Sequence, residues 1–249
     1  MLTGNHALVT GGGTGIGLAI ARALAAAGAQ VTIAGRRPEV LDAAAGAGLH
    51  PQAMDVTDEA SVRAGVKAAS AARGPIQICI ANAGLAEPAE LPGLSLDDWR
   101  RSMAVNLDGA FLTIRETLPA MQAAGWGRVI AISSVAGIKG MRRAAPYVAA
   151  KHGLVGLIRA LAADHAGAPL TFNALCPAYV ETGIAAQNIT RVMAREGLTQ
   201  EEASRLVHSA NPHNRLIAPE EIAAAALWLC GPGSGSVNGQ AIEIAGGEF

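Results

Sequence analysis

The sequence predicts an α/β fold in which helices cover both faces of a doubly wound parallel sheet, in three layers, α/β/α. Short apolar runs rich in branched residues alternate with Ala- and Leu-rich stretches along the chain, and this alternation is typical of such a sheet. The 249 residues, 51% of them hydrophobic, suffice for one large core. We therefore expect a single domain over residues 1–249 with a small helical substrate lid.

The expected elements follow one another with short connections. Strands are expected at 6–10, 30–35, 50–55, 76–82, 127–133, 169–176 and 239–245, and helices at 15–28, 38–46, 58–72, 96–122, 146–166 and 219–230. The pattern changes at 183–218, a polar stretch between a strand and a helix where a short connection would suffice. A mobile helical lid is expected there.

The composition disfavours several kinds of partner. A formal net charge of -1 leaves no basic face for nucleic acid, and no apolar stretch approaches the length of a membrane span. No secretory signal is visible, so the cytoplasm is the expected location. Cys79, Cys176 and Cys230 are widely spaced in apolar contexts, which favours buried free thiols over disulfides or a metal site.

A glycine-rich turn, Thr10–Gly17, lies between the first strand and the first helix. Glycines there let the backbone approach a pyrophosphate, and the helix N-terminus adds amide donors and a partial positive charge. The spacing Gly11-xxx-Gly15-x-Gly17 differs from the GxGxxG fingerprint, and a turn that is merely tight is the alternative. The turn predicts a Rossmann-type dinucleotide site.

The end of the second strand distinguishes between the two nicotinamide dinucleotides. An acidic residue about 20 residues after the glycine turn would bind the ribose hydroxyls of NAD, but this chain has Gly35-Arg36-Arg37. Two guanidinium groups match a 2′-phosphate through bidentate hydrogen bonds. NADP(H) is therefore favoured, and NAD(H) is the alternative if both arginines are solvated surface residues.

The region after the fifth strand carries the groups best suited to chemistry. An apolar run delivers Ser133 and Ser134 at the carboxyl end of the sheet, where open α/β folds bind ligands. Pro146 suits the first turn of a helix from which Tyr147 and Lys151 project on one face. A neighbouring ammonium lowers the pKa of a phenol, which would make Tyr147 an acid or base nearer neutral pH. Such a pair also occurs on many helices without any function.

Taken together, these motifs resemble the short-chain dehydrogenase/reductase family, in its single-domain form of roughly 250 residues. The resemblance runs from end to end and is carried by Thr10-Gly11-xxx-Gly15-Ile16-Gly17, Asp55-Val56, Asn82-Ala83-Gly84, Asn106, Ser134 and Tyr147-xxx-Lys151. It implies a catalytic set of Asn106, Ser134, Tyr147 and Lys151. Together with the glycine turn and the two arginines after the second strand, it gives as expected cofactor contacts Thr10, Gly11, Gly13, Thr14, Gly15, Ile16, Gly17, Arg36, Arg37, Asp55, Val56, Asn82, Ala83, Gly84, Tyr147, Lys151, Pro177, Val180 and Thr182.

The family also implies individual roles. Asp55 would meet the adenine amino group, and the turn that begins at Asn82 would steady the central sheet beside the cofactor. Asn106 would hold a helix kink and a water that relays protons to Lys151. Lys151 would also bind the nicotinamide ribose and lower the pKa of Tyr147.

The implied reaction is hydride transfer between NADP(H) and a small-molecule carbonyl compound or secondary alcohol. Ser134 and Tyr147 would polarise the carbonyl oxygen, and Tyr147 would protonate the forming alkoxide. The chain looks most like 3-oxoacyl-thioester reductases and 3-hydroxyacyl or hydroxybutyrate dehydrogenases of the family. The family further implies a homotetramer.

Two other functions are kept as alternatives. A non-catalytic NADP(H)-binding sensor or scaffold would have no need of the proton relay. A sugar-nucleotide-modifying member of the same superfamily would also use a Tyr-xxx-Lys pair, but typically carries a larger C-terminal domain than the about 70 residues that follow Pro177.

The chain departs from the family's pattern at two positions, and a further set of residues is expected on the substrate side. Ala81 and Ala178 stand where members commonly have Asn and Gly, and Ala takes a positive φ less easily, so the loop leading to Val180 and Thr182 is expected to sit differently. Arginines at the mouth could bind a carboxylate, a phosphate or a pantetheine-type thioester, or be solvated rim. The candidates here and in the lid are Arg142, Arg143, Gln187, Arg191, His208 and His213.

Overall fold

The computed structural model describes residues 1–88 and 90–248, which contain a seven-stranded parallel sheet in the order β3-β2-β1-β4-β5-β6-β7. The strands are β1 (His6–Thr10), β2 (Gln30–Gly35), β3 (Leu49–Ala53), β4 (Ile76–Ala81), β5 (Gly127–Ile132), β6 (Leu170–Pro177) and β7 (Ala241–Ile244). The predicted doubly wound parallel sheet is confirmed. Its order reverses between β1 and β4, and open α/β sheets bind ligands beyond the carboxyl ends of the strands at such a point.

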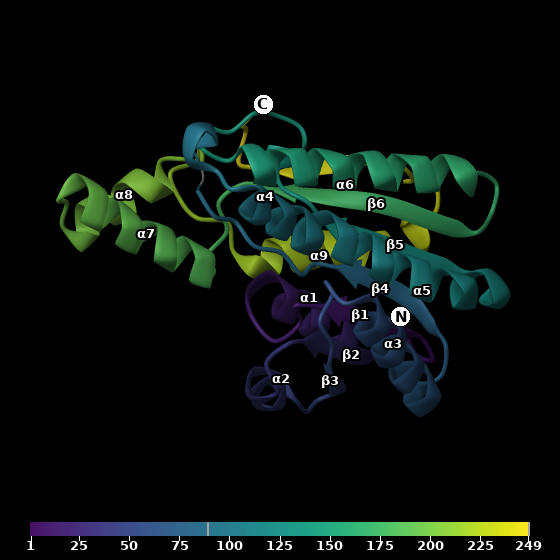
Figure 1. Ribbon diagram of the computed structural model, residues 1–249. Helices are drawn as coiled ribbons and strands as arrows, with labels where there is room; N and C mark the ends of the chain where they lie inside the picture. Colours follow the sequence, from purple (N-terminus) through teal and green to yellow (C-terminus); the bar gives the residue numbers. More distant parts are fainter. Residues whose placement is uncertain (89, 249) are drawn as a thin grey trace.

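Helices cover both faces of the sheet and complete the three layers (Figure 1). Their bounds are α1 (Gly15–Ala26), α2 (Pro38–Ala44), α3 (Glu59–Arg73), α4 (Leu96–Met103), α5 (Gly109–Ala124), α6 (Ala145–Asp164), α7 (Gly183–Glu196), α8 (Gln200–His208) and α9 (Pro219–Cys230). Successive strand residues point to opposite faces. Val9 and Ile33 therefore pack in the core beneath α1 and α9, whereas Leu8 packs beneath α3, and α5 and α6 cover β4, β5 and β6.

The predicted helix 96–122 is interrupted in the structure. A π-helical turn, η2 (Ala104–Asp108), separates α4 from α5. The side chain of Asn106 donates to the carbonyl oxygen of Ser102, four residues earlier, at 3.0 Å, and π turns inside helices are frequent at functional sites. A π turn thus lies at Asn106, where the family resemblance implies a kink, although the apolar pattern alone indicated one continuous helix.

Both edge strands are shorter than predicted. β3 ends at Ala53 instead of residue 55, and β7 begins two residues late and ends one residue early. β3 also contains Pro51, whose missing N–H is tolerated because this strand lies at the edge of the sheet. The early end of β3 leaves Asp55 in the loop that follows.

The segment 183–218 contains α7 and α8, which project beyond one end of the sheet at the left of Figure 1. Thr199 begins α8 with a capping box that it shares with Glu202. The two ends of the segment are tied together, because Val180 and Ile217 form a parallel bridge. Its predicted helical character is confirmed, and its mobility stays a prediction.

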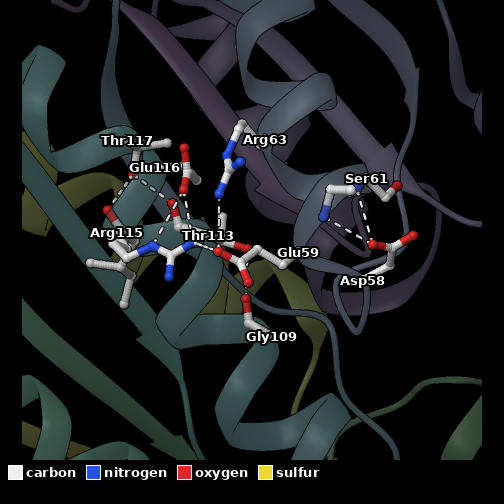
Figure 2. A network of polar contacts seen from close by, with 11 residues as sticks. Asp58, Glu59, Ser61, Arg63, Gly109, Thr113, Arg115, Glu116 and Thr117 are labelled. Atoms are coloured by element: carbon white, nitrogen blue, oxygen red, sulfur yellow. Dashed lines mark hydrogen bonds and ion pairs between the residues drawn. The ribbon is translucent and has the colours of Figure 1, made fainter.

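An exposed polar network joins α3 to α5 (Figure 2). The guanidinium of Arg115 donates to Glu59 at 2.7 Å and to Glu116 at 2.9 Å, and Arg63 donates to Glu59 at 3.0 Å. Asp58 caps α3 through backbone N–H groups of the first turn. Solvent screens such pairs, so they orient the two helices more than they stabilise them.

The described residues also bear on two expectations about the chain as a whole. None of the helices in 1–88 and 90–248 has the length and apolar character needed to cross a membrane. Cys79, Cys176 and Cys230 are buried free thiols, as predicted.

Candidate active site

A cleft of about 1330 Å³ opens at the carboxyl ends of the strands. Loops that follow β1, β2, β4, β5 and β6 line it, together with residues of α6 and α7. This is the edge at which the reversal of strand order predicts a ligand. Most residues singled out from the sequence lie in its wall: Gly11, Gly13, Thr14, Gly15, Ile16, Arg36, Arg37, Asp55, Val56, Asn82, Ala83, Gly84, Asn106, Ser134, Tyr147, Lys151, Pro177, Val180 and Thr182.

Thr10 and Gly17, which the resemblance names as cofactor contacts, lie outside the lining of the cleft. The Thr10 hydroxyl accepts hydrogen bonds from the backbone N–H groups of Asn82 and Ala83, both at 3.0 Å. A Cβ on Gly17 would collide with the carbonyl oxygen of Gly11. Both residues therefore support the glycine turn from behind, one by joining β1 to β4 and the other by allowing α1 to pack closely.

The N-terminus of α1 faces the cleft without a side chain that caps it. Thr14, at the N-cap position, makes no side-chain cap hydrogen bond, and the first turn has no acidic residue. Gly15 has a φ of +52°, a left-handed conformation that favours glycine. The amide groups and the partial positive charge of this helix end are thus suited to an anion.

Arg36, Arg37 and Asp55 line the cleft beyond β2 and β3. Both arginines are exposed. Partial burial raises the pKa of the Asp55 carboxyl, but hydrogen bonds from Thr57 and the charge of Arg36 outweigh it, so the pKa lies below its ordinary value. Asp55 is therefore a carboxylate at neutral pH, held in place by the N–H and hydroxyl of Thr57 at 2.9 and 2.8 Å.

Asn106 joins the π turn to the loop that follows β4. Its amide group donates to the carbonyl oxygen of Leu85 at 3.0 Å, and its Oδ1 accepts from the N–H of the same residue at 3.1 Å. A Cβ on Gly84 would lie 3.0 Å from Asn106 Oδ1 and 3.6 Å from Lys151 Nζ. These three residues, far apart in the chain, therefore meet at one point of the cleft.

Ser134, Tyr147 and Lys151 come from the end of β5 and the first turns of α6. Ser134 Oγ accepts from the backbone N–H of Ala136 at 3.1 Å. The Lys151 ammonium lies 5.7 Å from the centroid of the Tyr147 ring and donates to the carbonyl oxygen of Ile132 at 2.8 Å. The structure thus brings the three predicted side chains into one wall of the cleft.

Ser133, the residue before Ser134, makes a hydrogen bond to α6 instead of facing a substrate. Its hydroxyl donates to the backbone carbonyl of Lys151 at 3.3 Å. It therefore fastens α6 to the end of β5, while Ser134 keeps its own hydrogen for another acceptor.

Burial determines the acidity of Tyr147. Burial raises the pKa of the phenol, and a hydrogen bond with Ser134 lowers it by less, so the pKa lies above its ordinary value. Burial also lowers the pKa of the Lys151 ammonium to about 8. The net lowering of the Tyr147 pKa that was expected is not met, because burial outweighs the effect that lowers it.

The loop after β6 adopts its path without strain at Ala178. Its φ is not positive; the described non-glycine residues with a positive φ are Ala47, Arg143 and Asn214. A Cβ on Gly15 would lie 3.2 Å from the methyl group of Thr182. The loop therefore closes over the glycine turn, and its expected difference from the family's loop stays a prediction.

On the substrate side, the predicted residues separate into two groups. Arg142, Arg143, Gln187 and Arg191 line the cleft. His208 and His213 do not, because the ring of His213 packs against Gly246 at the end of the chain. Sequence reasoning missed Tyr179, which lines the cleft; its place just after the carboxyl end of β6 is the signal that could have found it.

Comparisons with known proteins agree with this geometry. A family model described as short chain dehydrogenase matches residues 5–192. A D-beta-hydroxybutyrate dehydrogenase of Cupriavidus necator is 34% identical, with 99% of this chain and 98% of that protein covered. A putative ketoacyl reductase of the monensin polyketide synthase of Streptomyces virginiae is 37% identical, with 98% and 97% covered.

A solved structure extends the likeness to three dimensions. The crystal structure of an actinorhodin polyketide ketoreductase variant with NADPH has a TM-score of 0.95 and 34% identity, and the match covers 99% of this chain and 98% of that one. Sequence and fold therefore agree over nearly the whole length, and the chain belongs to the short-chain dehydrogenase family of oxidoreductases.

Proposed function

We propose that the protein transfers a hydride between NADP(H) and a carbonyl compound or secondary alcohol, with Tyr147 as the acid or base. The convergence of Ser134, Tyr147 and Lys151 in the cleft that also holds the glycine turn carries this proposal. Relatives named as a hydroxybutyrate dehydrogenase and as ketoacyl reductases support 3-hydroxyacyl or 3-oxoacyl compounds as substrates.

The residues of the cleft fit a nicotinamide dinucleotide phosphate. The uncapped N-terminus of α1 suits the pyrophosphate, Arg36 and Arg37 suit the 2′-phosphate, and the buried Lys151 ammonium suits ribose hydroxyls. When bound, this group supplies or accepts the hydride. The protein's own task is then to orient the substrate and to move one proton.

The proton would reside on Tyr147 Oη in the reductive direction. Because burial raises the pKa of this phenol, the side chain is protonated at neutral pH and suited to donate to a forming alkoxide. Ser134 Oγ would donate its hydrogen to the same oxygen and stabilise the developing charge. In alcohol oxidation the proton would return to Tyr147, along the same path.

Replacing Tyr147 with Phe tests the proposal. We expect the Tyr147→Phe variant to bind NADPH as the native protein does and to lose roughly 10²- to 10⁴-fold in kcat, measured by absorbance of the reduced nicotinamide on a panel of ketones and 3-oxoacyl thioesters. Tyr179→Phe, at the other tyrosine of the chain, is the matched control and should lose far less. Undiminished turnover in Tyr147→Phe would refute the role of the phenol.

A wild-type protein that binds NADPH tightly but reduces nothing on the panel would point to the sensor or scaffold alternative. That result would support the cofactor site and contradict the proposed catalytic role of the cleft.

Cofactor preference is tested at Arg36 and Arg37. We expect the double variant Arg36→Ala/Arg37→Ala to weaken NADPH binding by about tenfold or more, since charge-assisted hydrogen bonds to the 2′-phosphate are lost. The Kd of NADH, which lacks this phosphate, should change little. A native protein that binds both dinucleotides equally would contradict the preference.

We further propose that the chain is one domain and that it assembles as a homotetramer in the cytoplasm. Two large apolar side chains, Phe111 on α5 and Trp228 on α9, are 42% and 49% exposed, which supports association through these helices. Three free thiols suit a reducing compartment. A monomer in sedimentation analysis would contradict the assembly.

A further inference from the structure

Cationic side chains outnumber carboxylates in the wall of the cleft. Among its described lining residues, seven are Lys or Arg and three are Asp or Glu. Lys151 and the two arginines after β2 have cofactor roles in the proposal above. The other four lie at the substrate end, on the stretch before α6 and on α7: Arg142, Arg143, Arg191 and Arg195.

Most of the nearby carboxylates already have partners. Glu90 pairs with Arg143 Nε at 2.9 Å, and Glu87 pairs with Arg101 outside this group at 2.6 Å. On α7, Arg195 Nε pairs with the neighbouring Glu196 at 2.7 Å. Among the described residues that line the cleft, no further acidic side chain is left at this end to neutralise the remaining two arginines.

Arg142 and Arg191 are these two remaining cations. Within residues 1–88 and 90–248, no ion pair joins either one to a carboxylate. Arg191 donates to the neutral Oδ1 of Asn188 at 3.2 Å, which directs the guanidinium without neutralising it. Charges concentrated in a cleft with low-dielectric walls attract a ligand of the opposite sign.

The backbone separates Arg142 from its neighbour. Arg143 has a φ of +55°, which costs on the order of 1 kcal/mol for a residue with a Cβ and is seen most often near functional sites. The two adjacent arginines therefore have different surroundings, since Arg143 is held by Glu90 and no carboxylate of the described residues pairs with Arg142. Arg142 also lies only five positions before Tyr147, so its position is fixed close to the start of α6.

Helix α7 presents a polar face to the cleft. Gln187, Arg191 and Arg195 follow one another at intervals of four residues and all line it, as expected for one side of a helix. α8 adds apolar lining through Leu206 and Val207. The lid therefore offers a ligand both an apolar surface and a cationic one.

We infer that Arg142 and Arg191 bind an anionic oxygen group of the substrate, a carboxylate or a phosphate, and so select ketones that carry a negative charge. Guanidinium groups bind both kinds of oxyanion through paired hydrogen bonds. The inference rests on the proposed reduction of a carbonyl group and names the class of compound that carries it. Arg142 lies just before α6 and Arg191 lies on α7. An anion bound by both side chains would therefore also join the lid to the start of α6.

Substrate pairs that differ only in charge test the inference. Reduction of 3-oxobutanoate is compared with that of its methyl ester, and reduction of a 3-oxobutanoyl pantetheine thioester is compared with and without its terminal phosphate. In the variant Arg142→Gln/Arg191→Gln we expect kcat/KM to fall by about tenfold or more for the anionic member of at least one pair, and by less than about twofold for its neutral counterpart. Loss on the acid identifies a carboxylate subsite, and loss on the phosphorylated thioester identifies a phosphate subsite.

Arg195→Gln is the matched control. It removes a cation of the same kind one turn further along α7, but one that is already paired with Glu196. Added salt should lower kcat/KM for the anionic substrate in the native protein and have little effect on the neutral one. The affinity for NADPH should be unchanged in all variants, which separates a substrate anion from a cofactor phosphate.

Three results would overturn the inference: equal losses on charged and neutral substrates, no loss on either, or an equal loss in Arg195→Gln. If the native protein reduces none of the compounds, the proposed reaction fails. Calorimetric binding of 3-oxobutanoate and its ester to the NADPH-loaded protein then tests the arginines alone. Tighter binding of the acid that disappears in the double variant supports the subsite, and equal binding contradicts it.

Discussion

Lys151 is a buried cation whose charge depends on pH within the range where enzymes are assayed. Its side chain is 3% exposed, and burial lowers the pKa of the ammonium to about 8. The carbonyl of Ile132 stabilises the charged form only in part, because one neutral acceptor does not replace the water that surrounds a free ammonium. The charge that would orient the cofactor ribose therefore weakens at mildly alkaline pH.

A pH profile checks this property. We expect kcat/KM for carbonyl reduction to decrease as the pH rises through about 8, because Lys151 loses its proton there. The pKa of an arginine is far higher, so Lys151→Arg should move this limb of the profile to higher pH if the larger side chain is accommodated. A profile that is flat between pH 7 and about pH 9 in the native protein would contradict the assigned charge state.

At the scale of single elements, the interruption between α4 and α5 serves to place a side chain. Asn106 is 1% exposed and satisfies both backbone groups of Leu85 while it bonds back to Ser102. In a regular α-helix each residue turns by about 100° about the axis, so the side chain of Asn106 would point in another direction. The π turn thus connects the helix to the loop that contains Gly84, directly beside Lys151.

Truncating Asn106 should destabilise the fold. In Asn106→Ala the partly buried N–H and carbonyl of Leu85 lose their partners, and leaving such groups unpaired costs about 1–3 kcal/mol. We expect the free energy of unfolding in urea to fall by an amount of that order. Asn188→Ala, at a half-buried position on α7 where the side chain accepts an exposed hydrogen bond from Arg191, should leave stability within about 0.5 kcal/mol of the native value. Equal stabilities of the two variants would mean that the contacts of Asn106 contribute nothing.

At the scale of the whole molecule, the two ends of the sheet have separate tasks. The cleft occupies the carboxyl ends of the strands, whereas His6 lies buried at the amino end of β1. His6 Nδ1 lies 2.8 Å from the carbonyl oxygen of Gly74, and Nε2 lies 2.8 Å from Thr32 Oγ1. This ring joins β1 to β2 and to the turn before β4, at the end of the sheet opposite the cleft.

Stability should therefore depend on pH through His6. Burial lowers the pKa of its ring, the bond to Gly74 raises it by less, and the charges of Arg73 and His50 lower it further, so the pKa lies below its usual 6.5. The unfolded chain takes up this proton more readily than the folded one. The contribution to stability is present above pH of about 6.5 and is lost as the pH falls towards and through the folded pKa.

Urea unfolding at a series of pH values measures this effect. The native protein should lose stability between about pH 7 and about pH 5, and His6→Gln should show a shallower dependence in that range. His152→Gln, which changes an exposed histidine of α6, should follow the native curve. A His6 variant with an unaltered pH dependence would assign the effect to other groups.

Much of this arrangement could be predicted because it depends on local patterns and spacings. The alternation of apolar runs located all seven strands, and the glycine turn, Asn106, Ser134 and the Tyr147-xxx-Lys151 pair identified the residues that meet in the cleft. A parallel sheet brings the carboxyl ends of its strands to one edge, so residues that follow strands converge whatever their separation in the chain.

Other features depend on neighbours that the chain supplies from distant segments. Thr10 and Gly17 support the glycine turn instead of lining the cleft, and the ring of His213 packs under Gly246. Tyr147 has a raised pKa because neighbouring segments bury part of its side chain, and the pairing of Arg143 with Glu90 leaves Arg142 free of a partner among the described residues. Spacing along the chain predicts which groups reach the cleft, whereas burial and the choice of partner arise only when separate elements pack together.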